Sequence, residues 1–185
     1  MNFINAAKSA LKTKSLFSYR IYQHAQARKV YWILYAAGNK IDEDRIKQVG
    51  ADRACAEWLL KCGAQVKFHS SSKFISDYNR LSATLGSNMK LAEVRAEEAT
   101  IMSIGFPHFD GVKELKKLSF IRCTSFNDSC INQLVQYIGP TITELNIIGC
   151  GSVTDKGVAA IKHFGNLKEL QLTGLSGVNN GRINL

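Results

Sequence analysis

The residues of this chain that could support catalysis or metal binding are its cysteines and histidines. The cysteines are Cys55, Cys62, Cys123, Cys130 and Cys150, and the histidines are His24, His69, His108 and His163. They form no CxxC or HxxxH pattern, so their spacing does not predict a zinc site. Cys55 and Cys62 are seven residues apart in an expected helix, which separates them by about 10 Å, too far for a disulfide bridge.

Two other short patterns resemble parts of catalytic or phosphate-binding sites. Asp42, Glu43 and Asp44 could bind a metal ion together, but carboxylates at this spacing more often cap a helix and stabilise its dipole. The run Gly149-Cys150-Gly151 resembles a glycine-rich loop, but glycine also suits the turn after a strand. The chain has no P-loop and no GxSxG or HExxH motif. These patterns favour a protein that is not an enzyme.

A repeated apolar pattern is the strongest structural signal in the sequence. Leu118-x-Phe120-x-x-Cys123 recurs 27 residues later as Leu145-x-Ile147-x-x-Cys150, and the steps between four successive copies are 24, 27 and 25 residues. This period is typical of leucine-rich repeats of the Cys-containing kind. We therefore predict an α/β fold, a short leucine-rich-repeat solenoid of about four repeats capped by a helical N-terminal domain. Cys123 and Cys150 then stack as buried thiols.

The repeat pattern also predicts which strand residues face outward. They are Glu93, Arg95 and Glu97; Lys117, Ser119 and Ile121; Glu144, Asn146 and Ile148; Glu169, Gln171 and Thr173. Four acids and two bases on this face would repel nucleic-acid phosphates. Ile121 and Ile148 are expected to be neighbours, which indicates either a protein contact or packing beneath a loop. On the first interpretation, the contact residues are Lys117, Ser119, Ile121, Glu144, Asn146 and Ile148.

The net charge of +9 comes mainly from the first part of the chain. Residues 1–41 contain seven basic residues and no acid, interleaved with apolar residues such as Leu11 and Phe17. This composition predicts a mitochondrial transit peptide over about residues 1–28. The alternative is a basic arm that binds nucleic acid or anionic lipid. We expect a helical N-terminal domain over residues 29–90 and the repeats over residues 91–185.

Helical and strand patterns are both expected before the repeats. Asp52 is expected to cap a helix over residues 53–62. Glu57 and Lys61 in that helix are expected to form a surface ion pair. Residues 64–68 alternate between apolar and polar side chains, which indicates a short strand.

Longer motifs resemble a known family. In the first half these are Asp44-Arg45-Ile46, Val49-Gly50, Asp52-Arg53-Ala54, Glu57-Trp58-Leu59-Leu60 and Cys62-Gly63-Ala64. Further along they are Asp77-Tyr78-Asn79, Ile101-Met102-Ser103-Ile104-Gly105-Phe106, Val153-Thr154-Asp155-Lys156-Gly157 and Asn166-Leu167-Lys168. Together they resemble the family of mitochondrial ATP synthase subunit s, also called coupling factor B, over roughly residues 30–178. A related branch assists assembly of the distal membrane arm of respiratory complex I.

The resemblance implies a peripheral, non-enzymatic protein on the matrix side of the inner mitochondrial membrane. Such a protein would support proton-driven ATP synthesis as a coupling or regulatory factor of ATP synthase. The resemblance also implies a magnesium ion held by the backbone carbonyls of Gly63 and Glu97. In the family, two thiols separated by one residue align with Ile121 and Cys123, so only the Cys123 thiol is present here.

Two other functions remain open from the sequence. The first is assembly of respiratory complex I, since the two branches share much of the pattern. The second is a ubiquitin-ligase substrate adaptor, because Cys-type repeats also occur in F-box proteins. No F-box-like segment precedes the repeats, and the basic leader favours mitochondria.

Overall fold

The computed structural model describes residues 32–83 and 89–178. The chain divides into two units, residues 1–37 and 38–185, and the described part of the first unit is helical. The predicted transit peptide, residues 1–28, lies outside the described residues. None of the helices that the structure describes has both the length and the apolar character needed to cross a bilayer.

Two consecutive helices open the second unit. α2 (Glu43–Val49) begins at Asp42, whose carboxylate accepts a hydrogen bond from the backbone N–H of Arg45 at 2.9 Å. This side-chain cap confirms the interpretation that the run Asp42-Glu43-Asp44 caps a helix rather than binding a metal ion. Gly50, at φ 84°, ends α2 and precedes α3 (Ala51–Lys61). Because glycine adopts this left-handed conformation without steric cost, the chain can turn sharply between the helices.

Asp52 does not cap α3, so that prediction is wrong. The N-cap position is Gly50, which makes no side-chain cap. The Asp52 carboxylate instead accepts hydrogen bonds from the backbone N–H of Leu91 at 2.9 Å and from Lys90 Nζ at 3.2 Å. Asp52 therefore ties the first turn of α3 to the start of the next strand, because a nearly buried carboxylate needs such partners.

A hairpin-like pair of strands starts the sheet. β1 (Gln65–Phe68) pairs antiparallel with β2 (Leu91–Glu97), and α4 (Tyr78–Ala83) lies between them in the chain. Gly63, at φ 88°, supplies the left-handed turn between α3 and β1. The strand predicted over residues 64–68 is confirmed. The predicted domain division after residue 90 falls between two strands of one sheet.

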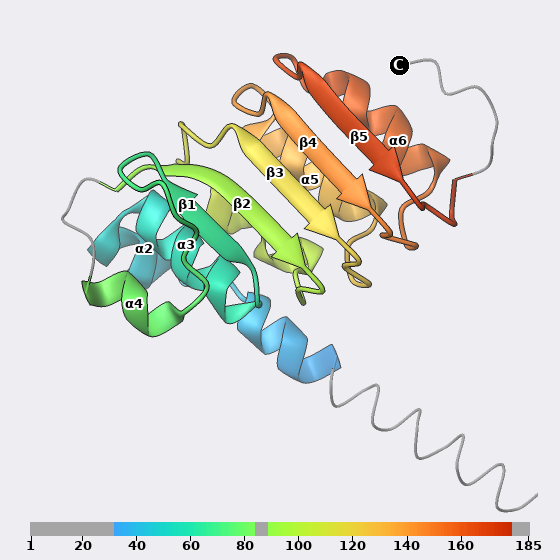
Figure 1. Cartoon of the computed structure of the whole chain (residues 1–185). Coiled ribbons are helices and arrows are strands. Elements are labelled where there is room, and N and C mark those ends of the chain that lie inside the picture. Colours follow the sequence, from blue (N-terminus) through green and yellow to red (C-terminus); the bar gives the residue numbers. More distant parts are fainter. Residues whose placement is uncertain (1–31, 84–88, 179–185) are drawn as a thin grey trace, which may run out of the picture. The chain divides into compact units, whose positions relative to one another are not determined.

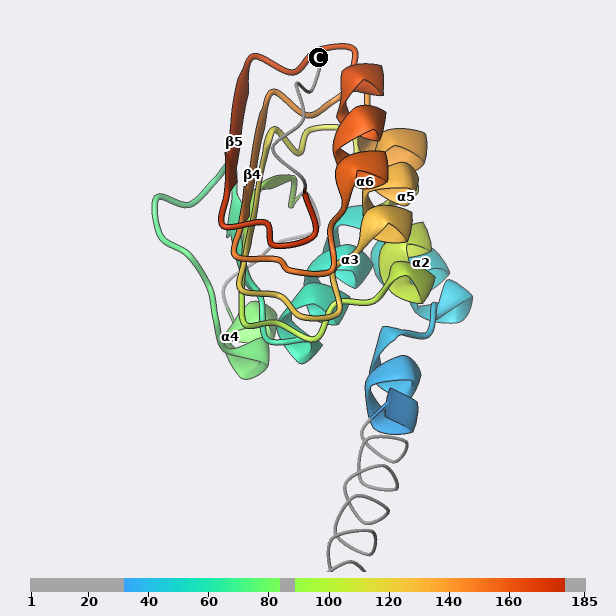
Figure 2. The ribbon, with the colours of Figure 1, turned by 90° about the vertical axis from the view of Figure 1, so that its right-hand side faces the viewer.

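From β2 onward, strands and helical segments alternate. The remaining elements are η1 (Ser103–Phe109), β3 (Lys117–Ile121), α5 (Asp128–Ile138), β4 (Glu144–Ile148), α6 (Asp155–Ala160), η2 (Ile161–His163) and β5 (Glu169–Thr173). The strand order is β1-β2-β3-β4-β5, and β2 to β5 are parallel (Figure 1). In Figure 2, α3, α5 and α6 lie on one side of the sheet. The predicted mixed α/β class is confirmed.

The inward residues of the repeated pattern form the core beneath the sheet. Leu118, Phe120 and Cys123 and their counterparts Leu145, Ile147 and Cys150 are fully buried. Burying one such large apolar side chain stabilises the fold by roughly 1.5–3 kcal/mol.

α5 and α6, behind the sheet, begin at matching polar residues. The Asn127 side chain accepts from the backbone N–H of Cys130 at the start of α5, and Thr154 accepts from Lys156 at the start of α6. The two caps are 27 residues apart, so they recur with the period of the repeat. The Asp128 carboxylate accepts hydrogen bonds from the N–H and the hydroxyl of Thr154 at 2.8 and 2.6 Å, which link one repeat to the next.

Candidate protein-contact surface

The face of the sheet opposite the helices carries three rows of side chains in register. The first row is Glu93, Lys117, Glu144 and Glu169; the second is Arg95, Ser119, Asn146 and Gln171; the third is Glu97, Ile121, Ile148 and Thr173. All twelve residues predicted to face outward are at least partly exposed. This face, which we call the outward face, contains all six residues predicted for a protein contact.

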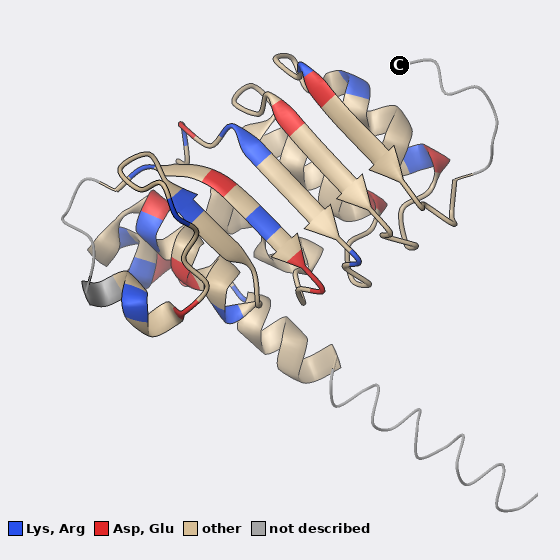
Figure 3. Cartoon of the chain, viewed as in Figure 1, with Lys and Arg blue, Asp and Glu red and all other residues tan. Residues whose placement is uncertain are grey.

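Charged side chains make up the first row, and their sign alternates from β2 to β4 before β5 adds a second acid (Figure 3). Lys67 on β1 pairs with Glu93 at 3.0 Å, and Lys117 pairs with Glu144 at 2.6 Å. The hydrogen bond from Lys117 lowers the pKa of Glu144 and raises that of Lys117. Because opposite charges stand on adjacent strands, these contacts favour the observed register.

Neutral polar groups fill the middle of the outward face. The Asn146 amide donates hydrogen bonds to the Ser119 hydroxyl at 3.2 Å and to the Glu144 carboxylate at 3.3 Å. Asn146 therefore links the second row to the first, and it holds a fixed pattern of donors and acceptors in the centre of the face.

Ile121 and Ile148 are adjacent in the third row, as predicted, and both are partly exposed. Within residues 38–83 and 89–178, no segment crosses over β3 to β5 on this side in either view of the ribbon (Figures 1 and 2). The alternative in which these isoleucines pack beneath a loop is therefore wrong for the described part of the chain. An uncovered apolar pair on a sheet face is typical of a contact surface.

A cluster of charges borders the third row at the ends of β2 and β3. Arg122 donates hydrogen bonds to Glu97 at 2.7 Å and to Glu98 at 2.9 Å, and Arg95 pairs with Glu97 at 3.6 Å. Two arginines and two glutamates thus neutralise each other beside the isoleucines.

The two residues predicted to hold magnesium are Gly63, in the turn after α3, and Glu97, the last residue of β2. A Cβ atom built on Gly63 would stand 3.9 Å from Ala99 Cα, two residues beyond Glu97, and the Thr100 N–H donates to the Cys62 carbonyl. The Glu97 carboxylate already pairs with Arg95 and Arg122. The backbone carbonyl oxygens of Gly63 and Glu97 are therefore the groups left to bind a magnesium ion. Such oxygens suit a hydrated Mg²⁺ but select it weakly. The described residues contain no cluster of three or more His, Cys, Asp or Glu ligands.

Cys123, the one thiol present of the family's pair, is buried together with Cys150, as predicted, and points away from the outward face. Its sulfur donates to the Ala96 carbonyl at 3.3 Å. A hydrogen bond with Cys150, together with burial, raises the pKa of the Cys123 thiol. Ile121 is outward and Cys123 is inward because Arg122, at φ 51°, turns the chain between them. The two positions that align with the family's thiols are therefore on opposite sides of the sheet.

The structure also places buried polar groups where sequence reasoning expected surface residues. Glu57 is buried and accepts hydrogen bonds from Arg45 and Arg53. The predicted surface ion pair between Glu57 and Lys61 is therefore wrong. The hydrogen bond from Arg45 is the main reason that the pKa of Glu57 is lowered. The fully buried Asn39 side chain accepts from Trp58 Nε1 and from the Met102 N–H. Arg53 is only four residues from Glu57, but the other partners are 12 to 63 residues apart, and contacts at such separations leave no periodic signal.

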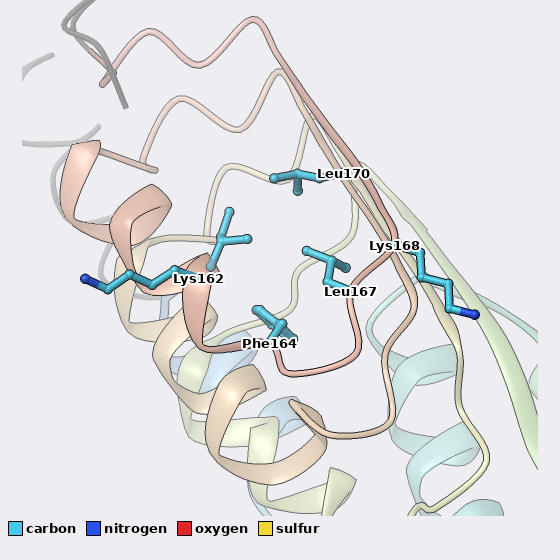
Figure 4. Close-up of a pocket in the computed structure, with 6 residues that line it drawn as sticks. Lys162, Phe164, Leu167, Lys168 and Leu170 are labelled. Atoms are coloured by element: carbon cyan, nitrogen blue, oxygen red, sulfur yellow. The ribbon is translucent and has the colours of Figure 1, made fainter. Parts of the chain in front are cut away.

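A pocket of about 240 Å³ lies near the start of β5. Its lining residues are Ile161, Lys162, Phe164, Leu167, Lys168 and Leu170. In Figure 4, the ammonium groups of Lys162 and Lys168 point away from the pocket, and apolar side chains fill its interior. Since no polar side chains of the lining converge there, the pocket is unsuited to acid–base or nucleophilic catalysis.

Known proteins resemble this chain over most of its length. It is 43% identical over 147 residues to human (Homo sapiens) "ATP synthase subunit s, mitochondrial", covering 78% of this chain and 74% of that protein. It is 38% identical over 169 residues to the Rattus norvegicus protein of the same name, covering 90% and 84%. A weaker similarity, 26% over 133 residues, covers 70% of this chain and 46% of the Drosophila melanogaster "Distal membrane arm assembly component 2". No family model matches the chain.

Proposed function

The chain belongs to the family of mitochondrial ATP synthase subunit s, and from this membership we propose that it acts on ATP synthase in mitochondria through protein contacts. The observation that carries the proposal is 43% identity over 78% of the chain to a protein of that name. The outward face supports it, because that face combines fixed polar groups with an uncovered apolar pair.

The repeated strand–helix units form a leucine-rich-repeat solenoid in this proposal. Its purpose is to present the outward face rather than to build a catalytic cleft. A non-enzymatic role is supported by the state of the thiols. Burial raises the pKa of Cys62 to about 12 and that of Cys130 to about 11, so both are protonated and unreactive at neutral pH.

More specifically, the proposed role on ATP synthase is that of a coupling or regulatory factor that supports proton-driven ATP synthesis. The protein acts on the matrix side of the inner membrane, as a peripheral partner of the membrane sector of ATP synthase. Residues 1–28 direct import, residues 29–90 form the helical N-terminal domain, and residues 91–185 carry the repeats. The acid-free composition of residues 1–41 supports the import step.

Magnesium has a structural role in this proposal. The backbone carbonyls of Gly63 and Glu97 would supply two oxygen ligands, and water would complete the coordination shell. The Glu97 carboxylate pairs with Arg95 and Arg122, so it is not counted among the ligands in this proposal.

Deletion of the gene tests the proposal. Respiration-coupled ATP synthesis in isolated mitochondria should fall, and re-expression of the full chain should restore it. Unchanged coupling in the deletion strain would contradict the proposed role.

Assembly of respiratory complex I is the second candidate function, favoured by the 26% identity to the Drosophila melanogaster assembly component. Native gels of mitochondria from the deletion strain separate the two candidates. Loss of complex I with intact ATP synthase would support the second, and the reverse pattern supports the first.

A further inference from the structure

The outward face has two distinct ends, one acidic and one apolar. We propose that it binds an amphipathic helix that places a basic side chain over Glu169 and an apolar side chain over Ile121 and Ile148. This inference rests on the proposed function, and it specifies the kind of ATP synthase segment that the protein would hold.

The acidic end arises because the first row ends on an acid without a matching base. Lys67 pairs with Glu93 and Lys117 pairs with Glu144, and the next residue in the row is Glu169. Among the described residues, no Lys, Arg or His nitrogen lies within 4.0 Å of the Glu169 carboxylate. Glu169 stands beside Glu144 and is exposed. Lys117 is near enough for Glu169 to help raise its pKa, but it pairs with Glu144, and the exposed Lys168 is the chain neighbour of Glu169. The Glu169 carboxylate itself has no direct ion pair and can accept one from a partner.

The apolar end is neutral as well as uncovered. Ile121 and Ile148 lie on adjacent strands, whose spacing is about 4.8 Å. The charges of Arg95, Arg122, Glu97 and Glu98 beside them cancel. An apolar side chain can therefore dock there without burying an unpaired charge.

A helix suits this face better than an extended strand. The face of a sheet offers side chains, since its backbone groups are already paired between strands. A docked strand would bury its own N–H and C=O groups without partners, whereas a helix satisfies them internally. The partner element is therefore helical.

The separation of the two ends sets the spacing on that helix. Glu169 stands opposite Glu144 on the next strand, and Glu144 is four residues from Ile148, so Glu169 and Ile148 are about 14 Å apart across the sheet. Positions i and i+7 lie on one side of a helix and are about 10.5 Å apart. The flexible stem of a lysine makes up the difference. The partner helix should thus carry Lys or Arg seven residues from Leu, Ile, Val or Phe.

Binding of the full chain to isolated mitochondrial ATP synthase tests the inference with paired variants. Glu169→Lys should weaken binding at least fivefold at about 0.02 M salt, and this loss should shrink to below about twofold at about 0.5 M salt because the effect is electrostatic. Ile148→Asp should weaken binding at least tenfold at both salt concentrations. Ile148→Ser is a milder replacement for use if Ile148→Asp does not fold. Thermal unfolding verifies that each variant folds.

The matched controls lie away from the outward face. Asp44→Lys reverses an exposed charge on α2, and Ile104→Asp changes an isoleucine in η1 that is 47% exposed. Both should bind within twofold of the wild type. Wild-type binding that neither outward-face variant weakens would overturn this inference and leave the proposed function standing, whereas absence of wild-type binding would overturn the proposed function itself.

The occupant of the face is identified by a photocrosslinking side chain at position 173, in place of Thr173. Crosslinking to a helix of an ATP synthase subunit supports the inference. Crosslinking to a second copy of this chain, or to residues 1–31 of the same chain, would overturn it.

Discussion

The guanidinium of Arg45 donates two hydrogen bonds, 2.7 and 2.8 Å long, to the carboxylate of Glu57. Arg45 lies on α2 and Glu57 on α3, so this bidentate pair joins two helices. Glu57 is buried, and Arg53 supplies a further hydrogen bond at 3.2 Å. Loss of this carboxylate should therefore loosen the packing of α2 on α3.

Glu57→Gln should reduce the free energy of unfolding at pH 7 by about 1.5–3 kcal/mol, since hydrogen bonds to a charged group are lost. The folded-state pKa of Glu57 lies below its ordinary value of 4.5. Its stabilisation is thus present above that value and disappears as the pH falls through the folded-state pKa. Urea unfolding from pH 7 to about pH 3 should show the wild type and the variant converging. A constant difference across this range would contradict the role given to the carboxylate.

Asp52→Ala should lower the free energy of unfolding by about 1–3 kcal/mol, because the buried N–H of Leu91 would lose its acceptor. Chemical denaturation measures the effect. Asp44→Ala is the control, since the Asp44 side chain is 87% exposed and its pair with Lys47 is long, at 3.5 Å. That change should fall within about 0.5 kcal/mol of the wild type. Equal losses in both variants would refute a special role for Asp52.

Gly105→Ala should destabilise the protein by about 1–3 kcal/mol through overpacking. A Cβ atom at Gly105 would stand 2.5 Å from the Trp58 ring, which stacks on His108 with centroids 4.9 Å apart. Near-ultraviolet circular dichroism and thermal unfolding should both report the change. Gly165→Ala serves as the comparison because nothing lies within 4 Å of its Cβ position. A wild-type melting temperature for Gly105→Ala would show that the ring can move aside.

The five cysteines should be nearly inert in the native state. All are buried and free, and burial raises the pKa of Cys55, Cys62 and Cys130. The hydrogen bond between Cys123 and Cys150 raises the pKa of Cys123 and lowers that of Cys150 to about 7, so burial alone protects Cys150 from a reagent. Because the thiolate is the reactive form, a colorimetric disulfide reagent at pH 8 should titrate less than about one thiol per native chain. It should titrate all five in denaturant. Rapid reaction of a native thiol would reopen an enzymatic interpretation.

The repeat and the outward face could be predicted because they depend on local periodicity. Strand side chains alternate, so the 27-residue step between Leu118 and Leu145 also predicted that Ile121 and Ile148 would be neighbours. The polar contacts of α3 could not be predicted in this way. Asp52 meets Leu91 across 39 residues, and Glu57 meets Arg45 in a different helix. Such contacts depend on how elements pack together, and single-sequence patterns carry no information about that.

Photocrosslinking from the centre of the outward face in intact mitochondria tests the central claim most directly. A crosslinking side chain at position 146, in place of Asn146, is placed in the full imported chain, and the attached neighbour is identified by mass spectrometry. We predict that a subunit of ATP synthase is captured, and that the yield falls when Ile148→Asp is added. Capture of a complex I assembly intermediate, with no ATP synthase subunit, would contradict the account.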